Sequence, residues 1–172
     1  MKRILCISLF VLAGPLAAQS APGAVASAGA VWSSSIANII KSAEQAPESL
    51  YSYKATPEVR SFGQLIGHVA GAQYSYCSAV LGEPLKAEDD IEKTKTSKAD
   101  LVDAIKASTE YCKNAYAVSD AAAQSMVKVF GQDRTKLYAL IANASHDSEH
   151  YGNIVTYLRL NKMIPPSSQP RQ

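Results

Sequence analysis

The chain has 172 residues and a formal net charge of +2, and 47% of its residues are hydrophobic. This length suits one domain with a core of its own, and the composition excludes collagen-like, low-complexity and strongly disordered chains. No block of one charge sign stands out, so we expect no nucleic-acid partner.

Residues 1–20 are typical of a secretory signal peptide. A basic start at Lys2 and Arg3 precedes the apolar run Ile4–Ala13, and small residues offer cleavage after Ala18 or Ser20. The run is shorter than the roughly 20 residues that span a bilayer. We therefore expect a periplasmic or extracellular protein with no stable membrane insertion after cleavage, the alternative being an uncleaved N-terminal helix. Cleavage leaves equal numbers of basic and acidic residues and two cysteines.

The rest of the chain is predicted to be all-α. Apolar residues recur with helical spacing in four segments: Ala24–Ala43, Ser61–Leu81, Ser97–Val118 and Arg134–Lys162. Ser61 and Gln64 match a capping box at the start of the second helix. No segment alternates apolar and polar residues over a useful length, so no strand is expected. These features predict a four-helix bundle over residues 24–166 and a loose tail over 167–172.

The two long connections, residues 82–96 and 119–133, bear on the order of the helices. The first is polar, whereas the second carries apolar residues that we expect to lie over one end of the bundle. About 15 residues can recross a bundle, so the second and third helices can run parallel. Parallel packing brings Cys77 and Cys112 to the same height, which predicts a disulfide in an oxidising compartment. Two buried free thiols are the alternative.

The three histidines of the sequence are candidate metal ligands. His146 and His150 are i,i+4 neighbours on one face of the fourth helix, and His68 lies at the edge of the apolar face of the second. Three imidazoles from two facing helices can hold one divalent ion. Helical projection adds five residues that we expect to orient a ligand or position a substrate: Gln64, Asn143, Asp147, Asn153 and Tyr157.

Other motifs for bound metals and cofactors fit less well. His146–His150 matches H-x-x-E-H, but the inverted zinc-protease site needs an acidic ligand downstream, and residues 151–172 contain no Asp or Glu. A di-iron carboxylate bundle needs two Glu-x-x-His pairs. No haem-attachment motif, phosphate-binding loop or nucleophile elbow is present.

Two stretches resemble DinB-like proteins: Pro57–Ala70, and His146–Asn153 with Tyr157-Leu158-Arg159 and the exit Ile164-Pro165-Pro166. The resemblance extends over about residues 28–168. It implies an up-down-down-up four-helix bundle with a long crossover between helices 2 and 3, and a divalent metal held by His68, His146 and His150. Related proteins of this superfamily transfer low-molecular-weight thiols or isomerise thiol adducts, whereas export would separate this chain from such cytosolic thiols.

We therefore expect an exported protein with an open three-histidine site for zinc or nickel. It would act as a metal-dependent hydrolase or thiol-transferase-like enzyme on a small molecule of unknown identity. Two alternatives stay open, a non-catalytic metal-stabilised or interaction bundle and a plain bundle with histidines in its core. The oligomeric state is also open, with a homodimer as one option.

Overall fold

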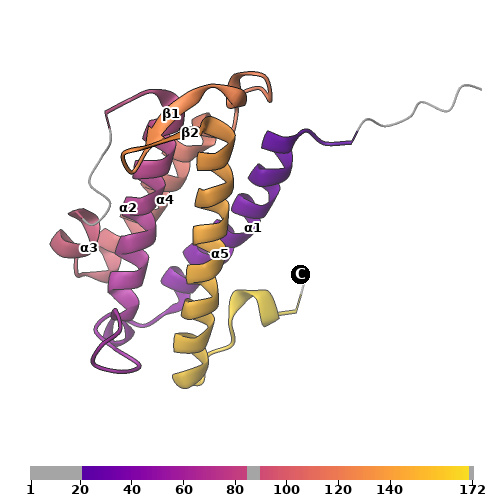
Figure 1. The fold of residues 1–172 in the computed structure, drawn as a ribbon. Coiled ribbons are helices and arrows are strands. Elements are labelled where there is room, and N and C mark those ends of the chain that lie inside the picture. The colour runs from indigo at the N-terminus through magenta and orange to yellow at the C-terminus, as the bar shows by residue number, and fades with distance from the viewer. Residues whose placement is uncertain (1–20, 85–89, 171–172) are drawn as a thin grey trace, which may run out of the picture.

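The computed structural model describes residues 21–84 and 90–170, so the predicted signal peptide lies outside the described residues. The fold is mostly helical, and its long helices lie side by side (Figure 1). They are the four predicted helices with slightly shifted ends: α1 (Ala24–Gln45), α2 (Phe62–Leu81), α4 (Lys98–Ala115) and α5 (Lys136–Leu160).

Helix α2 is the central element of the bundle. It packs against both α4 and α5, while α1 packs mainly against α5. Most residues of α2 are buried as a result. The largest fully buried apolar side chains come from all four long helices: Ile39, Phe62, Ile66, Leu101, Ile105, Leu140, Ile154 and Leu158. A side chain at almost any position of α2 therefore faces a neighbouring helix rather than water.

The start of α2 is fixed by the capping box expected from the sequence. Ser61 Oγ accepts a hydrogen bond from the Gln64 backbone N–H, and Gln64 Oε1 accepts one from the Ser61 backbone N–H. These reciprocal bonds satisfy backbone donors that a helix start otherwise leaves unpaired. The first turn of the helix that carries His68 is thereby fixed.

A disulfide joins α2 to α4. Cys77 and Cys112 are both fully buried, and their Cα atoms are 5.4 Å apart. The bond closes a loop that contains the whole connection between the two helices. A short helix, α3 (Asp90–Thr94), forms within the part of this connection that the structure describes, where the sequence predicted only a polar segment.

The prediction of no strands was wrong. Strands β1 (Met126–Val129) and β2 (Gln132–Thr135) form an antiparallel hairpin at one end of the bundle (Figure 1). Arg134 belongs to β2, so the fourth long helix begins two residues later than expected. The turn uses Phe130 and Gly131, whose φ angles of 47° and 79° match the left-handed conformations of a two-residue hairpin. Four-residue strands are too short to give a clear alternation, and a Phe-Gly turn lacks the usual Asn-Gly signature.

The C-terminal segment folds back on the bundle. The Tyr151 hydroxyl donates a hydrogen bond to Ser167 Oγ, and the Gln169 amide donates one to Gln45 Oε1. These contacts lie in the stretch where the sequence suggested a loose tail. Over residues 21–84 and 90–170, no helix has the length and apolar character that crossing a membrane requires.

Candidate metal centre

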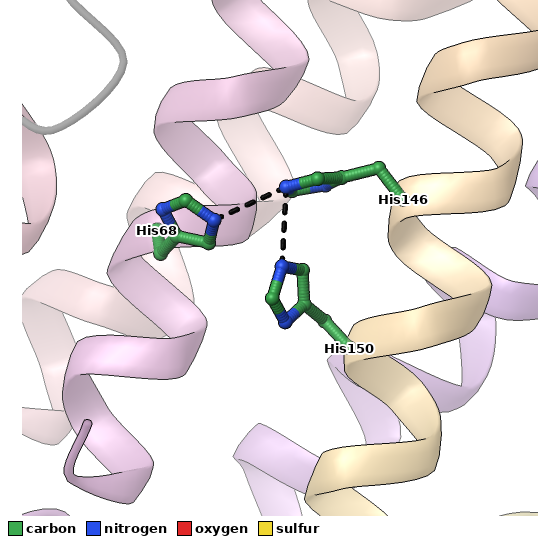
Figure 2. A group of neighbouring side chains, drawn as sticks. All are labelled: His68, His146 and His150. Carbon is green, nitrogen blue, oxygen red and sulfur yellow. Dashed lines mark hydrogen bonds between the residues drawn. The ribbon is translucent and has the colours of Figure 1, made fainter. Parts of the chain in front are cut away.

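The three histidines meet between α2 and α5, with their Nε2 atoms converging (Figure 2). His146 Nε2 lies 3.1 Å from His68 Nε2 and 3.1 Å from His150 Nε2. One ring nitrogen from each histidine lies within 4.8 Å of those of the other two. Within the described part of the chain this is the group of His, Cys, Asp and Glu residues whose geometry suits an ion.

The spacing fits an ion better than a set of hydrogen bonds. Two nitrogens at about 2.0–2.1 Å from a tetrahedral zinc ion lie about 3.3 Å apart, close to the distances between these rings. A single ring nitrogen carries either one proton or one lone pair, so His146 Nε2 cannot form a good hydrogen bond with both neighbouring nitrogens at once. A cation facing three lone pairs satisfies all three nitrogens together.

The surroundings of His68 and His150 keep these two imidazoles uncharged, which is the form that binds metals. Burial, reinforced by the Arg60 charge and by the other two rings, lowers the pKa of His68 to about 3. Burial, with the His146 ring as the next cause, lowers the pKa of His150 to about 4. Neutral rings at pH 7 offer lone pairs without first losing a proton.

Glu92 is a residue of the site that the sequence did not indicate. It lies on α3, and its Oε2 is 3.4 Å from His68 Nδ1, the ring nitrogen that faces away from the cluster. Its Oε1 accepts a hydrogen bond of 2.9 Å from Arg60 Nε. A carboxylate in this position orients a ligating imidazole and fixes its tautomer. Glu92 lies among many other charges in the connection between α2 and α4, and nothing in its local sequence distinguishes it from Asp90.

Gly67 allows α3 to approach this closely. A Cβ atom at Gly67 would lie 2.9 Å from the Glu92 Cα and 3.1 Å from its backbone nitrogen. Any larger residue would therefore push the α3 backbone away from α2 at the level of His68. Gly67, which precedes His68 in the chain, thus allows the Glu92 carboxylate to lie beside the His68 ring.

Two of the predicted supporting residues lie beside the histidines. Asn153 Nδ2 is 3.3 Å from His150 Nδ1. A metal at Nε2 leaves the proton on Nδ1, so the Asn153 amide would then present its oxygen to the ring. Asp147 is fully buried, its Oδ1 is 3.7 Å from His146 Nδ1, and neither carboxyl oxygen has a hydrogen-bond partner among the described residues. Burial raises the pKa of Asp147 well above its usual value.

The other three predicted residues have their principal contacts elsewhere. Asn143 is buried, and its amide contacts the Tyr116 hydroxyl and Cys77 Sγ, at 3.3 Å and 3.9 Å. Gln64 is engaged in the cap of α2. The Tyr157 hydroxyl donates a hydrogen bond of 2.5 Å to the backbone oxygen of Arg60, which ties α5 to the segment before α2.

A cavity of about 670 Å³ opens beside His150. Its lining includes His150, Asn153 and Tyr157 from α5, together with Arg60 and Glu92. The site is therefore next to a space large enough for a small molecule, with both polar and apolar surface. The carboxylates of Glu92 and Asp147 approach the Nδ1 side of the His68 and His146 rings, opposite the Nε2 atoms that converge.

Comparison with known proteins confirms the family resemblance. The model of the DinB superfamily matches residues 32–154, most of the chain. The chain belongs to the DinB superfamily. Among solved structures, this DinB-superfamily protein is similar to a DinB-like protein from Bacillus cereus, with a TM-score of 0.70 and 16% identity, over 81% of this chain and 93% of that one. This similarity shows a shared fold. No curated protein is significantly similar to the sequence.

Proposed function

We propose that this DinB-superfamily protein binds one divalent metal ion through His68, His146 and His150. The convergence of three imidazole nitrogens, two pairs of them at 3.1 Å and all three within 4.8 Å of one another, is the observation that carries the proposal. Zinc or nickel suits three nitrogens best, although imidazole accepts several first-row metals.

The ligand set supports an open, enzyme-like site. Three protein ligands leave a coordination position for water or substrate, and the cavity beside His150 gives access to it. When bound, the ion would supply Lewis acidity toward a water, a thiol or a carbonyl. We infer a metal-dependent hydrolase or thiol-transferase-like activity on a small molecule.

The protein's own residues would prepare the site. Glu92 and Asn153 would hold the rings of His68 and His150 in the orientation that presents Nε2. Asp147 would serve His146 in the same way. Arg60 and Tyr157 line the cavity and would contact the substrate.

We further propose that the protein is exported and that its helices run up-down-down-up. Residues 1–20 have the features of a cleavable leader, and a disulfide between Cys77 and Cys112 suits an oxidising compartment. The two cysteines stand at similar distances from the first residues of α2 and α4, as parallel helices require. The mass of protein recovered outside the cytoplasm tests both cleavage after Ala18 or Ser20 and the disulfide.

Metal content is the direct test. Protein purified without an affinity tag should contain close to one equivalent of metal by elemental analysis, and His68→Ala should lose it. If the wild-type protein neither retains nor takes up zinc, nickel or cobalt, the proposal fails and the plain bundle remains.

A metal that only joins α2 and α5 is the second candidate, because the ligands come from both helices. Thermal unfolding with and without a chelator separates the two functions. A purely structural ion should contribute much of the stability and should show no exchangeable water. An open site should leave the apo protein folded and should bind azide or a small thiol, seen as a change in the visible spectrum of the cobalt form.

A further inference from the structure

A second cavity, of about 790 Å³, lies next to the proposed metal centre and has a basic lining. Among the described residues of its lining, the cationic side chains of Lys54, Arg60, Lys93 and Lys95 outnumber the carboxylate of Glu92. They come from two separate segments, the loop before α2 and the region of α3, which lie at the same end of the bundle (Figure 1).

This concentration of positive charge is local. Acidic and basic residues of the whole chain nearly balance. The cavity beside His150 carries Glu58 and Glu92 against Arg60, so the described lining there is not basic. A concave surface lined by one sign of charge focuses the field and concentrates counter-ions of the opposite sign. The basic cavity therefore favours a small anion.

The basic cavity is connected to the histidines through two shared residues. Arg60 and Glu92 line both cavities. Glu92 contacts Arg60 through one oxygen and His68 Nδ1 through the other. A ligand bound among the lysines would thus lie against the same carboxylate that orients a proposed metal ligand.

We propose that the basic cavity binds the oxyanion group, phosphate or carboxylate, of a small molecule whose other end reaches the histidine site. Lys54 and Lys95 neutralise the anion from opposite segments, and Thr96 in the same lining offers a hydroxyl donor. The anion site stands on the lining alone. The placement of the ligand's other end at the histidines rests on the proposed metal function.

The test titrates apo and cobalt-loaded protein with inorganic phosphate and, separately, with citrate, at low and moderate salt. Calorimetry measures the dissociation constant. The dissociation constant of the double variant Lys54→Gln/Lys95→Gln should be about tenfold higher than that of wild type. Each exposed ion pair that is lost raises this constant by about a few-fold at most. The control Lys41→Gln/Lys136→Gln makes the same change in net charge at residues that line neither cavity, and should bind within about twofold of wild type.

The outcomes separate the two proposals. Anion binding to apo wild-type protein that the cavity variant loses supports the anion site, even if the protein takes up no metal. Metal uptake without anion binding supports the metal function and overturns the anion site. Equal losses in the cavity variant and its control mean that net charge alone attracts the anion, which also overturns it. The ratio of the phosphate and citrate constants identifies which oxyanion the site prefers.

Discussion

Replacing His146 by alanine should weaken metal binding at least about 100-fold with little effect on the apo fold. His146 is the ring whose Nε2 lies 3.1 Å from both of the other Nε2 atoms, so its loss removes the central ligand of the cluster. Its side chain is partly buried at the edge of the core, and its neighbours are uncharged rings. We expect the apo variant to lose about 1 kcal/mol or less of its free energy of unfolding.

The effect on the metal-bound protein is much larger. At a free metal concentration of 100 times the wild-type Kd, binding stabilises the folded state by about 2.7 kcal/mol. For a domain of this size that raises the Tm by about 5–11 °C. Losing a residue that merely supports a ligand weakens metal sites by about 10–100-fold, so losing a ligand should cost at least the upper value. At the same metal concentration the variant would gain at most about 0.4 kcal/mol, or about 1 °C.

Differential scanning calorimetry of chelated and zinc-loaded protein measures both quantities. Glu149→Ala is the matched control, because Glu149 is an exposed residue of α5 between His146 and His150 and is not a ligand in the proposed site. The control should keep the full metal-dependent rise in Tm. If His146→Ala keeps it too, or if Glu149→Ala loses it, the three-nitrogen site is wrong.

Four further predictions concern the supports of the site and the bundle. Glu92→Gln should weaken zinc binding about tenfold in a chelator competition and leave the apo Tm within about 2 °C of the wild-type value. An unchanged Kd for zinc would mean that the carboxylate does not orient His68. Asp147→Asn removes a buried carboxyl whose pKa is raised by burial. At pH 7 the Tm of the apo variant should therefore equal that of the wild type or exceed it by up to about 4 °C, while zinc binds about tenfold more weakly. A large loss of apo stability would contradict this. Because the pKa of His68 falls to about 3 on folding, against about 6.5 when unfolded, the unfolded apo chain binds more protons between those values. Apo stability should therefore decrease as the pH falls from about 6.5 toward 4, with a slope that is smaller in His68→Ala; equal slopes would refute the assignment. Replacing both Cys77 and Cys112 by serine opens a loop of sequence separation 35, so denaturant unfolding should show a loss of about 4 kcal/mol, and no loss would imply that the oxidised protein gains nothing from the bond.

The helices and the histidine pair on α5 could be predicted because their signals are local or periodic. Ser61 and Gln64 are three residues apart, and the capping box depends on that spacing alone. His146 and His150 must share a face wherever their segment is helical. The pairing of His68 with them needed the pattern of the whole chain and the family resemblance, because it depends on how α2 packs against α5.

The parts that were missed depend on contacts that one segment does not encode. The five residues of α3 are too few for a periodic signal, and Glu92 becomes a partner of His68 only through the docking of α3 on α2. Helical projection placed Asn143 on the same side as the histidines but ignored its height along α5, where Tyr116 takes its amide instead. The sequence does not indicate the hairpin, because its turn residue Phe130 adopts a positive φ that is typical of Asn or Gly.

At Gly67, the residue that would best stabilise α2 differs from the residue that the histidine site requires. As a glycine within α2, it lowers the intrinsic helix preference by about 1 kcal/mol relative to alanine. A substitution chosen only to stabilise the helix would therefore favour Gly67→Ala. The added methyl would meet the backbone of Glu92 at 2.9 Å and move α3 outward, taking with it the carboxylate at His68 and part of the wall shared by the two cavities. In this fold, a more stable α2 would come with a less well oriented His68 ring.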